Sequence, residues 1–287
     1  MASLRDIKRR ITSVKSTQKI TRAMKIVAAA KLRRAQEAIV QARPYAYRMR
    51  ALASDVATRA DRDAHPLLRQ HVDDQGPIHL IAVTGDRGLS GAYNANIINR
   101  TIELTDHEFT GRDVHVTMVG RRGVDAFKRR RRSLASSYTG VADGPVFRTA
   151  GDIIGEPVRA FAEGECAGVY VLYAEFKSAI SQHVTLEQFL PLQADPPAGP
   201  ETPVDFIYEP GEPAVLGQLL ERHLRVQMHR VLFEAAASEQ GARMTAMDAA
   251  TKNAGNMIEQ LSQQYNRARQ EAITTELIEV ISGAEAL

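Results

Sequence analysis

Apolar residues near the N-terminus follow the narrow stripe of a coiled coil. They recur with spacings that alternate between four and three, at Ile7, Ile11 and Val14, and again at Ala28, Leu32, Ala35, Ile39 and Ala42. Between these runs the same register holds Gln18, Thr21 and Lys25, while Ile20, Met24 and Val27 move to a neighbouring face. This alternation is the period of a seam, the line of residues that faces a partner helix. No proline precedes Pro44, so we expect one long helix here.

A second and more regular stripe runs through the C-terminal segment. No proline follows Pro213, so the last 74 residues are compatible with a single helix of roughly 110 Å. The seam positions in this segment are Met244, Met247, Thr251, Ala254, Ile258, Leu261, Tyr265, Ala268 and Ala272. From Ile273 onward the segment is rich in Ile, Leu, Val and Ala. A projecting helix with an apolar end must bury that end, so we expect it to enter another protein.

The two stripes lie at opposite ends of one chain, which favours two long helices wound around each other in an antiparallel coiled coil. Many seam residues are small, such as Ala, Thr and the adjacent Gly255, so the two backbones can approach closely. Two ordinary amphipathic helices in a bundle are the alternative explanation of the same periodicity.

The middle of the chain alternates short apolar runs with amphipathic segments. Buried strands are predicted at residues 79–84, 113–119, 168–174 and 183–190, with one more at 204–208. Helices are predicted at 91–105, through Val124 and Phe127, and at 151–163. Strands interleaved with helices indicate a mainly parallel sheet, and therefore an α/β fold with a Rossmann-like central domain.

The predicted organisation has three parts. Residues 1–59 form the N-terminal coiled-coil helix, residues 60–210 the α/β globular domain, and residues 211–287 the C-terminal coiled-coil helix. The proline-rich stretch at 193–203 is expected to be a linker.

Basic residues are concentrated at the N-terminus. Residues 1–50 hold 14 Lys and Arg against only Asp6 and Glu37, whereas the remainder holds 23 basic and 32 acidic residues. A basic helix is compatible with an acidic protein partner, a nucleic-acid backbone or an acidic membrane surface. Because the basic residues flank the apolar seam, we favour an acidic protein partner, with a merely solvated face as the alternative.

Candidate catalytic chemistry is sparse. Thr84 to Gly91 lies between a predicted strand and a predicted helix, where phosphate-binding loops occur, but its glycine spacing is G-x-x-G-x-x-G and no Gly-Lys-Ser/Thr is present. The eight histidines show no metal-ligand spacing, and the single Cys166 excludes an internal disulfide. We therefore expect no cofactor, no metal and no active site. No run of 18 apolar residues and no signal-peptide core occur, so direct membrane insertion is not expected.

Three segments resemble the gamma subunit of F-type ATP synthase. They are Arg10 to Leu32 in the N-terminal helix, Asp86 to Asn94 after the first strand, and Ser238 to Ala286 in the C-terminal helix. The family pattern I-T-x-E-x-x-E-x-x-x-G-A-x-A fits Ile273 to Ala286 without a gap. Ser90 and Ala92 depart from the Cys and Gly that the family commonly has at these positions. The resemblance spans the whole order of helix, α/β domain and helix.

The resemblance implies a rotary shaft that couples proton translocation to ATP synthesis or hydrolysis. Its expected partners are the alpha and beta subunits of the catalytic ring, the epsilon subunit and the membrane c-subunit ring, with no nucleic acid. The nucleotide chemistry would belong to alpha and beta, so this chain would be a non-catalytic subunit of an enzyme complex. The positions that match family contacts with the ring are Met24, Lys25, Arg243, Arg269, Gln270, Thr274 and Glu276.

The same resemblance implies a location. The chloroplast form carries an extra segment with a cysteine pair, which this chain lacks, so thiol regulation of that type is not expected. No transit peptide precedes Met1, so we expect a bacterial protein, peripheral at the cytoplasmic face of the inner membrane. The competing hypotheses are a Rossmann-like nucleotide-binding protein with a coiled-coil arm, and a nucleic-acid-binding coiled coil that uses residues 1–50.

Overall fold

The computed structural model describes residues 4–59, 65–69, 76–141, 146–192 and 211–285. The chain divides into two compact units, one formed by Met1–Ala29 with Arg243–Leu287 and the other by Ala30–Ala242. We call the described residues of the first the helix pair and those of the second the α/β unit. The predicted strand at 204–208 and the predicted linker at 193–203 lie outside the described residues.

Two long helices frame the sequence. They are α1 (Leu4–Arg59) and α5 (Glu212–Glu285). The stripe of α1 continues past Pro44, because Ala46, Met49 and Ala53 are buried at the next positions of the same spacing. A proline inside a helix removes one hydrogen bond, but the buried stripe runs through it unchanged.

The α/β unit contains the remaining elements. Its strands are β1 (Ile78–Val83), β2 (Val114–Val119), β3 (Ser136–Tyr138), β4 (Gly168–Phe176) and β5 (Gln182–Leu190). Its helices are η1 (Pro66–Leu68), α2 (Tyr93–Glu103), the π-helical turn η2 (Leu104–Glu108), α3 (Arg121–Arg129) and α4 (Val146–Ala162). The predicted helix at 91–105 is therefore α2 and the start of η2, and the helix predicted at 151–163 begins five residues earlier.

The strands form one sheet in the order β3-β2-β1-β4-β5. Neighbouring strands are parallel except for β5, which pairs with β4 as an antiparallel hairpin. The predicted α/β fold class and four of the predicted strands are confirmed. The prediction missed β3, because Ser-Ser-Tyr offers no apolar run and the strand depends on pairing with β2.

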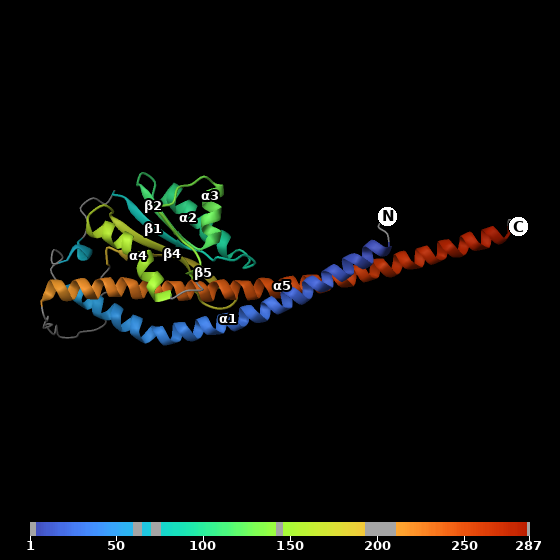
Figure 1. The fold of residues 1–287 in the computed structure, drawn as a ribbon, viewed down its shortest axis with the longest axis horizontal. Helices are drawn as coiled ribbons and strands as arrows, with labels where there is room; N and C mark the ends of the chain where they lie inside the picture. Colours follow the sequence, from blue (N-terminus) through green and yellow to red (C-terminus); the bar gives the residue numbers. More distant parts are fainter. Residues whose placement is uncertain (1–3, 60–64, 70–75, 142–145, 193–210, 286–287) are drawn as a thin grey trace. The chain divides into compact units, whose positions relative to one another are not determined.

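Helices cover both faces of the sheet (Figure 1). Alternate residues of β1 point to opposite faces: Ile81 and Val83 join a core with α4 and the first part of α5, whereas Leu80 and Ala82 join a core with α2 and α3. Every residue of β1 is buried, as expected for a central strand of a parallel sheet.

Candidate functional site: the helix pair

The seam predicted for α5 is present in the structure. None of its nine predicted positions is exposed, and the residues between them are mostly exposed; Met247 and Ala254 are the least exposed of the nine, at 5% and 7%. On α1 the buried positions include Ile7, Thr21 and Ala28. Ile20 and Val27 lie off this line and are more than half exposed, as the sequence predicted.

Three contacts fix the direction of the helix pair. Lys25 Nζ lies 2.5 Å from Asp248 Oδ1, and Thr251 Oγ1 lies 2.8 Å from Thr21 Oγ1. A Cβ atom at Gly255 would lie 3.3 Å from Gln18 Nε2, slightly closer than ordinary van der Waals contact, so these two residues lie side by side. Residue numbers fall along α1 as they rise along α5, so the predicted antiparallel pairing is confirmed. Within this unit Figure 1 shows the start of α1 (blue) beside the distal part of α5 (red).

The only charged residue in the predicted N-terminal seam is paired across it. The Lys25 ammonium donates a hydrogen bond to Asp248 Oδ1 and so lowers the pKa of that carboxyl, and Lys252 lowers it further. Both side chains of the Lys25–Asp248 pair keep a third or more of their surface in solvent. Ion pairs this exposed stabilise a fold by only ~0–1 kcal/mol at most sites, so the pair selects the register more than it holds the helices together.

The seven residues expected to contact the ring lie in three places along the helix pair. Met24 and Lys25 are half-buried, Lys25 in the seam and Met24 beside it, and Arg243 is buried, 8% exposed, with partners of its own. The other four, all exposed on distal α5, are Arg269, Gln270, Thr274 and Glu276. The helical rise places Arg243 and Arg269 roughly 40 Å apart, so the seven residues form no single pocket but an extended surface.

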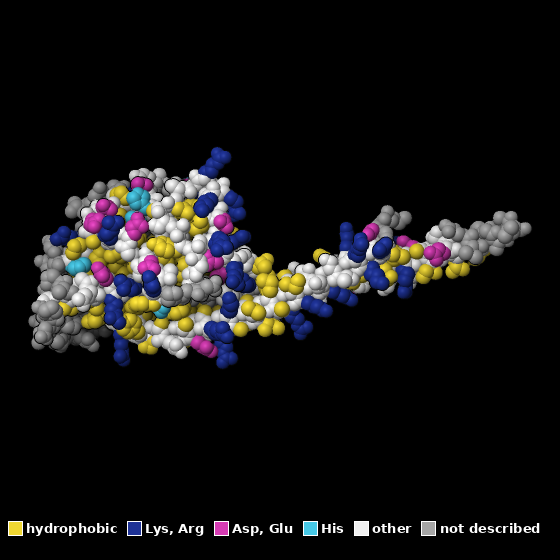
Figure 2. All heavy atoms as spheres, in the orientation of Figure 1, with side chains coloured by type: hydrophobic (Ala, Val, Ile, Leu, Met, Phe, Trp, Pro, Cys, Tyr) yellow, Lys and Arg dark blue, Asp and Glu magenta, His cyan; other side chains and the backbone are white. Residues whose placement is uncertain are grey.

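The distal end of α5 presents apolar side chains to solvent. Ile273, Leu277, Ile278 and Ile281 are 49–57% exposed. Ile273, Leu277 and Ile281 are four apart and form one stripe. Figure 2 shows apolar side chains (yellow) along this stretch and Lys and Arg (dark blue) standing out along the helices. A contiguous exposed apolar stripe of this kind is typical of a protein interaction site.

The glycine loop after β1 is occupied by side-chain contacts. The Gly85 amide donates to Asn94 Oδ1 (2.8 Å). The Asp86 carboxylate accepts from the amides of Arg121 (2.9 Å) and Gly140 (3.0 Å). The Glu239 carboxylate lies so close to Gly85 that an added Cβ atom would be 2.6 Å from its Oε1.

These contacts argue against a nucleotide at this loop. The adjacent cavity of about 240 Å³ is lined mainly by apolar residues, and its charged lining residues are the two carboxylates Asp86 and Glu239 against the single Arg34. Phosphate-binding loops depend on backbone amides that point at the anion, whereas the Gly85 amide is used within the protein and two carboxylates stand nearby. An anion here would meet repulsion.

Among the described residues, no group of three or more His, Cys, Asp or Glu could hold a metal ion. No helix in the described part of the chain is long and apolar enough to cross a membrane. No sequence pattern indicated a partly buried charge cluster around Arg230 in the α/β unit. Arg230 and its partner Glu187 are 43 residues apart and belong to no local motif.

Together these features define a class of protein: an α/β unit whose first and last helices also form an antiparallel pair with an exposed apolar end. The chain belongs to the ATP synthase family, whose match covers residues 3–287, and within it to the gamma chains. It is 47% identical to the ATP synthase gamma chain of Anaeromyxobacter sp. (strain Fw109-5) over 291 residues, and 43% identical to that of Salinibacter ruber over 305 residues. The match covers all of this chain in both cases, and 100% and 99% of the relatives.

Solved structures share the fold. One is a chain of the Euglena gracilis mitochondrial ATP synthase in rotational state 3, with a TM-score of 0.70 and 19% identity over 99% of this chain and 94% of that one. Another belongs to the central stalk and c-ring of the Tetrahymena thermophila mitochondrial enzyme, with a TM-score of 0.60 and 23% identity over 80% and 99%. The predicted identification as a gamma-type rotor shaft of a membrane-bound ATP synthase is confirmed.

Proposed function

We propose that the helix pair turns inside a ring of alpha and beta subunits, while the globular domain, residues 60–210, rests on the membrane c-subunit ring beside epsilon. Proton translocation then turns the shaft, and its asymmetric surface drives the catalytic sites of the ring through different states. The chain is peripheral, at the cytoplasmic face of a bacterial inner membrane. The seven residues named above make the contact with the ring, and the chain itself hydrolyses no ATP.

The exposed apolar end of α5 is the observation that carries this proposal. The pairing of Gln18 with Gly255 places Leu4, the first described residue of α1, level with about Arg269 of α5. The apolar stripe from Ile273 therefore lies beyond the last described turn of its partner helix. Burying an Ile or Leu side chain fully contributes about 1.5–3 kcal/mol. An apolar sleeve in the ring would bury these side chains without favouring any one rotational position of the helix pair, because hydrophobic contact is non-directional.

The polar surface fits a contact that must be remade at each step of rotation. Gln270 and Thr274 lie four apart on one exposed face, and the Thr274 hydroxyl is already satisfied by the Gln270 carbonyl at 2.8 Å. Exposed ion pairs contribute only ~0–1 kcal/mol. Acidic loops of the ring would therefore attract the basic helix α1 while releasing each position readily.

The test replaces apolar side chains in the stripe. Leu277→Ser with Ile278→Ser should leave the melting of the free chain unchanged, because both side chains are exposed. Reconstituted with alpha and beta subunits, the variant should assemble at least ~10-fold more weakly, since it loses two buried apolar groups. Ile180→Ser, at the exposed tip of the β4–β5 hairpin, is the matched control and should assemble normally.

Normal assembly and ATPase turnover of the Leu277/Ile278 variant would contradict the proposal. ATP hydrolysis by the free chain would contradict the assignment of the chemistry to alpha and beta. Tight duplex DNA binding at physiological salt would instead favour the nucleic-acid hypothesis for the basic helix.

A further inference from the structure

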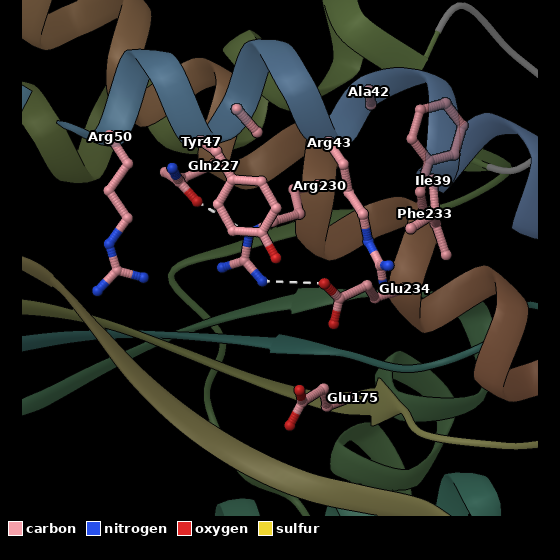
Figure 3. A pocket seen from close by; sticks show the side chains of 11 residues that line it. Ile39, Ala42, Arg43, Tyr47, Arg50, Glu175, Gln227, Arg230, Phe233 and Glu234 are labelled. Carbon is pink, nitrogen blue, oxygen red and sulfur yellow. Dashed lines mark hydrogen bonds and ion pairs between the residues drawn. The ribbon is translucent and has the colours of Figure 1, made fainter. Parts of the chain in front are cut away.

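Arg230 of α5 ties this helix to the sheet of the α/β unit through every nitrogen of its guanidinium. Nε donates to Gln227 Oε1 at 2.8 Å. Nη1 donates to the Tyr173 hydroxyl at 3.1 Å and to Glu234 Oε1 at 3.0 Å. Nη2 donates to both carboxylate oxygens of Glu187, at 2.7 and 2.6 Å. The partners come from β4, β5 and α5 itself, and Figure 3 shows Arg230 and Glu234 lying beneath α1.

The cluster is largely removed from solvent. The side chains of Arg230 and Glu187 are 23% and 27% exposed, and that of Glu234 is 15% exposed. Tyr173 is buried and also donates its hydroxyl proton to Glu187 at 3.0 Å. Burial raises the pKa of Glu234, although Arg230 opposes the shift. Charge-assisted hydrogen bonds are stronger and more directional than neutral ones in such surroundings.

A cavity interrupts the packing of α5 on one side of the cluster. On the α1 side the cluster adjoins a cavity of about 180 Å³, lined among others by Arg43, Tyr47 and Glu175. Elsewhere the sheet-facing side of α5 in this unit is apolar, with Leu220, Leu224 and Met228 in the core. Apolar burial holds a helix against a sheet but is non-directional, whereas bonds from one guanidinium to two strands resist a turn of the helix about its own axis.

A contribution to folding stability does not by itself explain these charges. Replacing a buried ion pair with apolar residues of similar volume is often neutral or stabilising, so such pairs are weak evidence for a stabilising role. A device that fixes geometry is the better explanation where the element must transmit a turning force. The helix that carries Arg230 continues unbroken to Glu285, so a torque applied at this point reaches the helix pair through one backbone.

We infer that the Arg230–Glu187 pair is the joint that sets the rotational position of α5 on the sheet, and that Arg230 is a positioning residue through which the α/β unit turns the shaft. This inference rests on the proposed rotary function. It assigns the pair no contact with nucleotide or with the ring. Its failure therefore leaves that function standing.

The experiment measures torsional stiffness in the assembled complex. A probe is attached to the α/β unit while the catalytic ring is fixed and stalled, and the angular fluctuation of the probe is recorded. Arg230→Met with Glu187→Met should increase the angular variance at least about twofold, because the directional bonds are gone while apolar volume is kept. Arg230→Lys keeps the buried charge but cannot bond to four partners at once, and should give an intermediate increase.

Two controls separate the joint from general destabilisation. Arg132→Met with Asp106→Met removes an ion pair between η2 and the end of α3, away from α5, and should leave the variance unchanged. Exchanging the pair, Arg230→Glu with Glu187→Arg, should restore part of the stiffness. Unchanged variance in both the Met/Met and the Lys variants, whatever their melting temperatures, overturns the inference. A wild-type complex that does not rotate at all would count against the proposed function instead.

Discussion

Helix α5 has one stretch in the α/β unit and one in the helix pair, and the two stretches are packed differently. Within the α/β unit, Leu216, Leu220, Leu224, Met228 and Val231 are at most 1% exposed and pack against the sheet. Within the helix pair, the least exposed seam residues of α5 keep 5–7% of their surface, and the other seam positions keep more. The first stretch is a core helix, and the second is half of a two-stranded stripe.

The two stretches of α5 are stabilised in different ways. A wide apolar face on a sheet buries enough surface to hold the helix without help, whereas a narrow stripe between two helices buries little and leaves both outer faces wet. The distal stretch therefore depends on whatever surrounds it for much of its order.

Truncating one leucine in each stretch should give the largest contrast. Leu220→Ala should lower the free energy of unfolding of the α/β unit by about 2–5 kcal/mol, because a fully buried side chain leaves a cavity. Leu261→Ala should lower local stability by less than half as much, since that side chain is only partly buried. Hydrogen exchange followed separately in the two stretches measures both. Equal effects would mean that the helix pair is as tightly packed as the core.

Substitutions at two glycines, one in the α/β unit and one in the helix pair, should have opposite effects on stability. Gly120 has φ 93°, and an added Cβ atom would lie 2.1 Å from the Thr84 carbonyl oxygen. Gly120→Ala should therefore destabilise the α/β unit by at least about 1–3 kcal/mol. At Gly255 the nearest atom to an added Cβ is the end of the flexible Gln18 side chain, so Gly255→Ala should stabilise the helix by up to about 1 kcal/mol. Thermal melting of both variants checks the signs, and loss of stability at Gly255 would show tight backbone packing there.

The helix pair was predictable because its signal is local. Spacings of three and four, uninterrupted by proline after residue 213, predict which positions of α5 face inward, and none of those positions is exposed in the structure. The central strands were predictable for the same reason, since each is one apolar run. The order of the strands and the antiparallel direction of β5 depend on pairing between distant segments, which no local pattern encodes.

The candidate site was predictable only in part. The projecting apolar end was predictable, because the proline-free segment is too long for a compact domain and is rich in Ile, Leu, Val and Ala from Ile273 onward. The Arg230–Glu187 pair was not predictable, because it joins a helix to a strand across 43 residues. The pair between Arg132 and Asp106 of η2 was not predictable either, because it joins segments 26 residues apart.

Lowering the pH should change the stability of the two units differently, because no histidine occurs in residues 1–29 or 243–287. Burial lowers the pKa of His79 below its usual 6.5, and His115, 5.1 Å away between ring centroids, lowers it further against the opposing Glu156 and Glu165. His79 is thus more easily protonated unfolded than folded, so its contribution to stability is present above about pH 6.5 and is lost as pH falls below that value.

His79→Leu should remove this part of the pH dependence, which for one proton is at most about 1.4 kcal/mol per pH unit. The measurement is urea unfolding of wild type and variant between pH 7.5 and 5, a range chosen around the usual histidine pKa of about 6.5. His183→Leu, on an exposed position of β5, is the matched control and should keep the wild-type slope. An identical slope in the His79 variant would show that other groups carry the acid sensitivity.

The smallest expected effect is that of removing a hydroxyl from the contact between Thr21 and Thr251 in the helix pair. Thr251 Oγ1 lies 2.8 Å from Thr21 Oγ1 and 2.7 Å from the Met247 carbonyl, while the Thr21 hydroxyl donates to the Gln18 carbonyl. One hydroxyl proton serves either contact but not both, so Thr251 already has a partner within its own helix. Thr251→Val should therefore destabilise the helix pair by only about 0.5–1 kcal/mol.

The valine keeps the shape of the threonine, so the comparison isolates the hydroxyl. Thr251→Ser, which keeps the hydroxyl and loses the methyl, is the complementary variant. If polar contacts set the register of the helix pair, the valine variant should exchange its distal α5 amides faster while the serine variant stays close to wild type. If the apolar seam sets it, the serine variant should be the weaker one. Because the seam is narrow and buries little apolar area, we expect the polar contact to set the register and the apolar seam to set the overall stability. Amide exchange reports on the register and thermal melting on the overall stability, so both are measured on both variants.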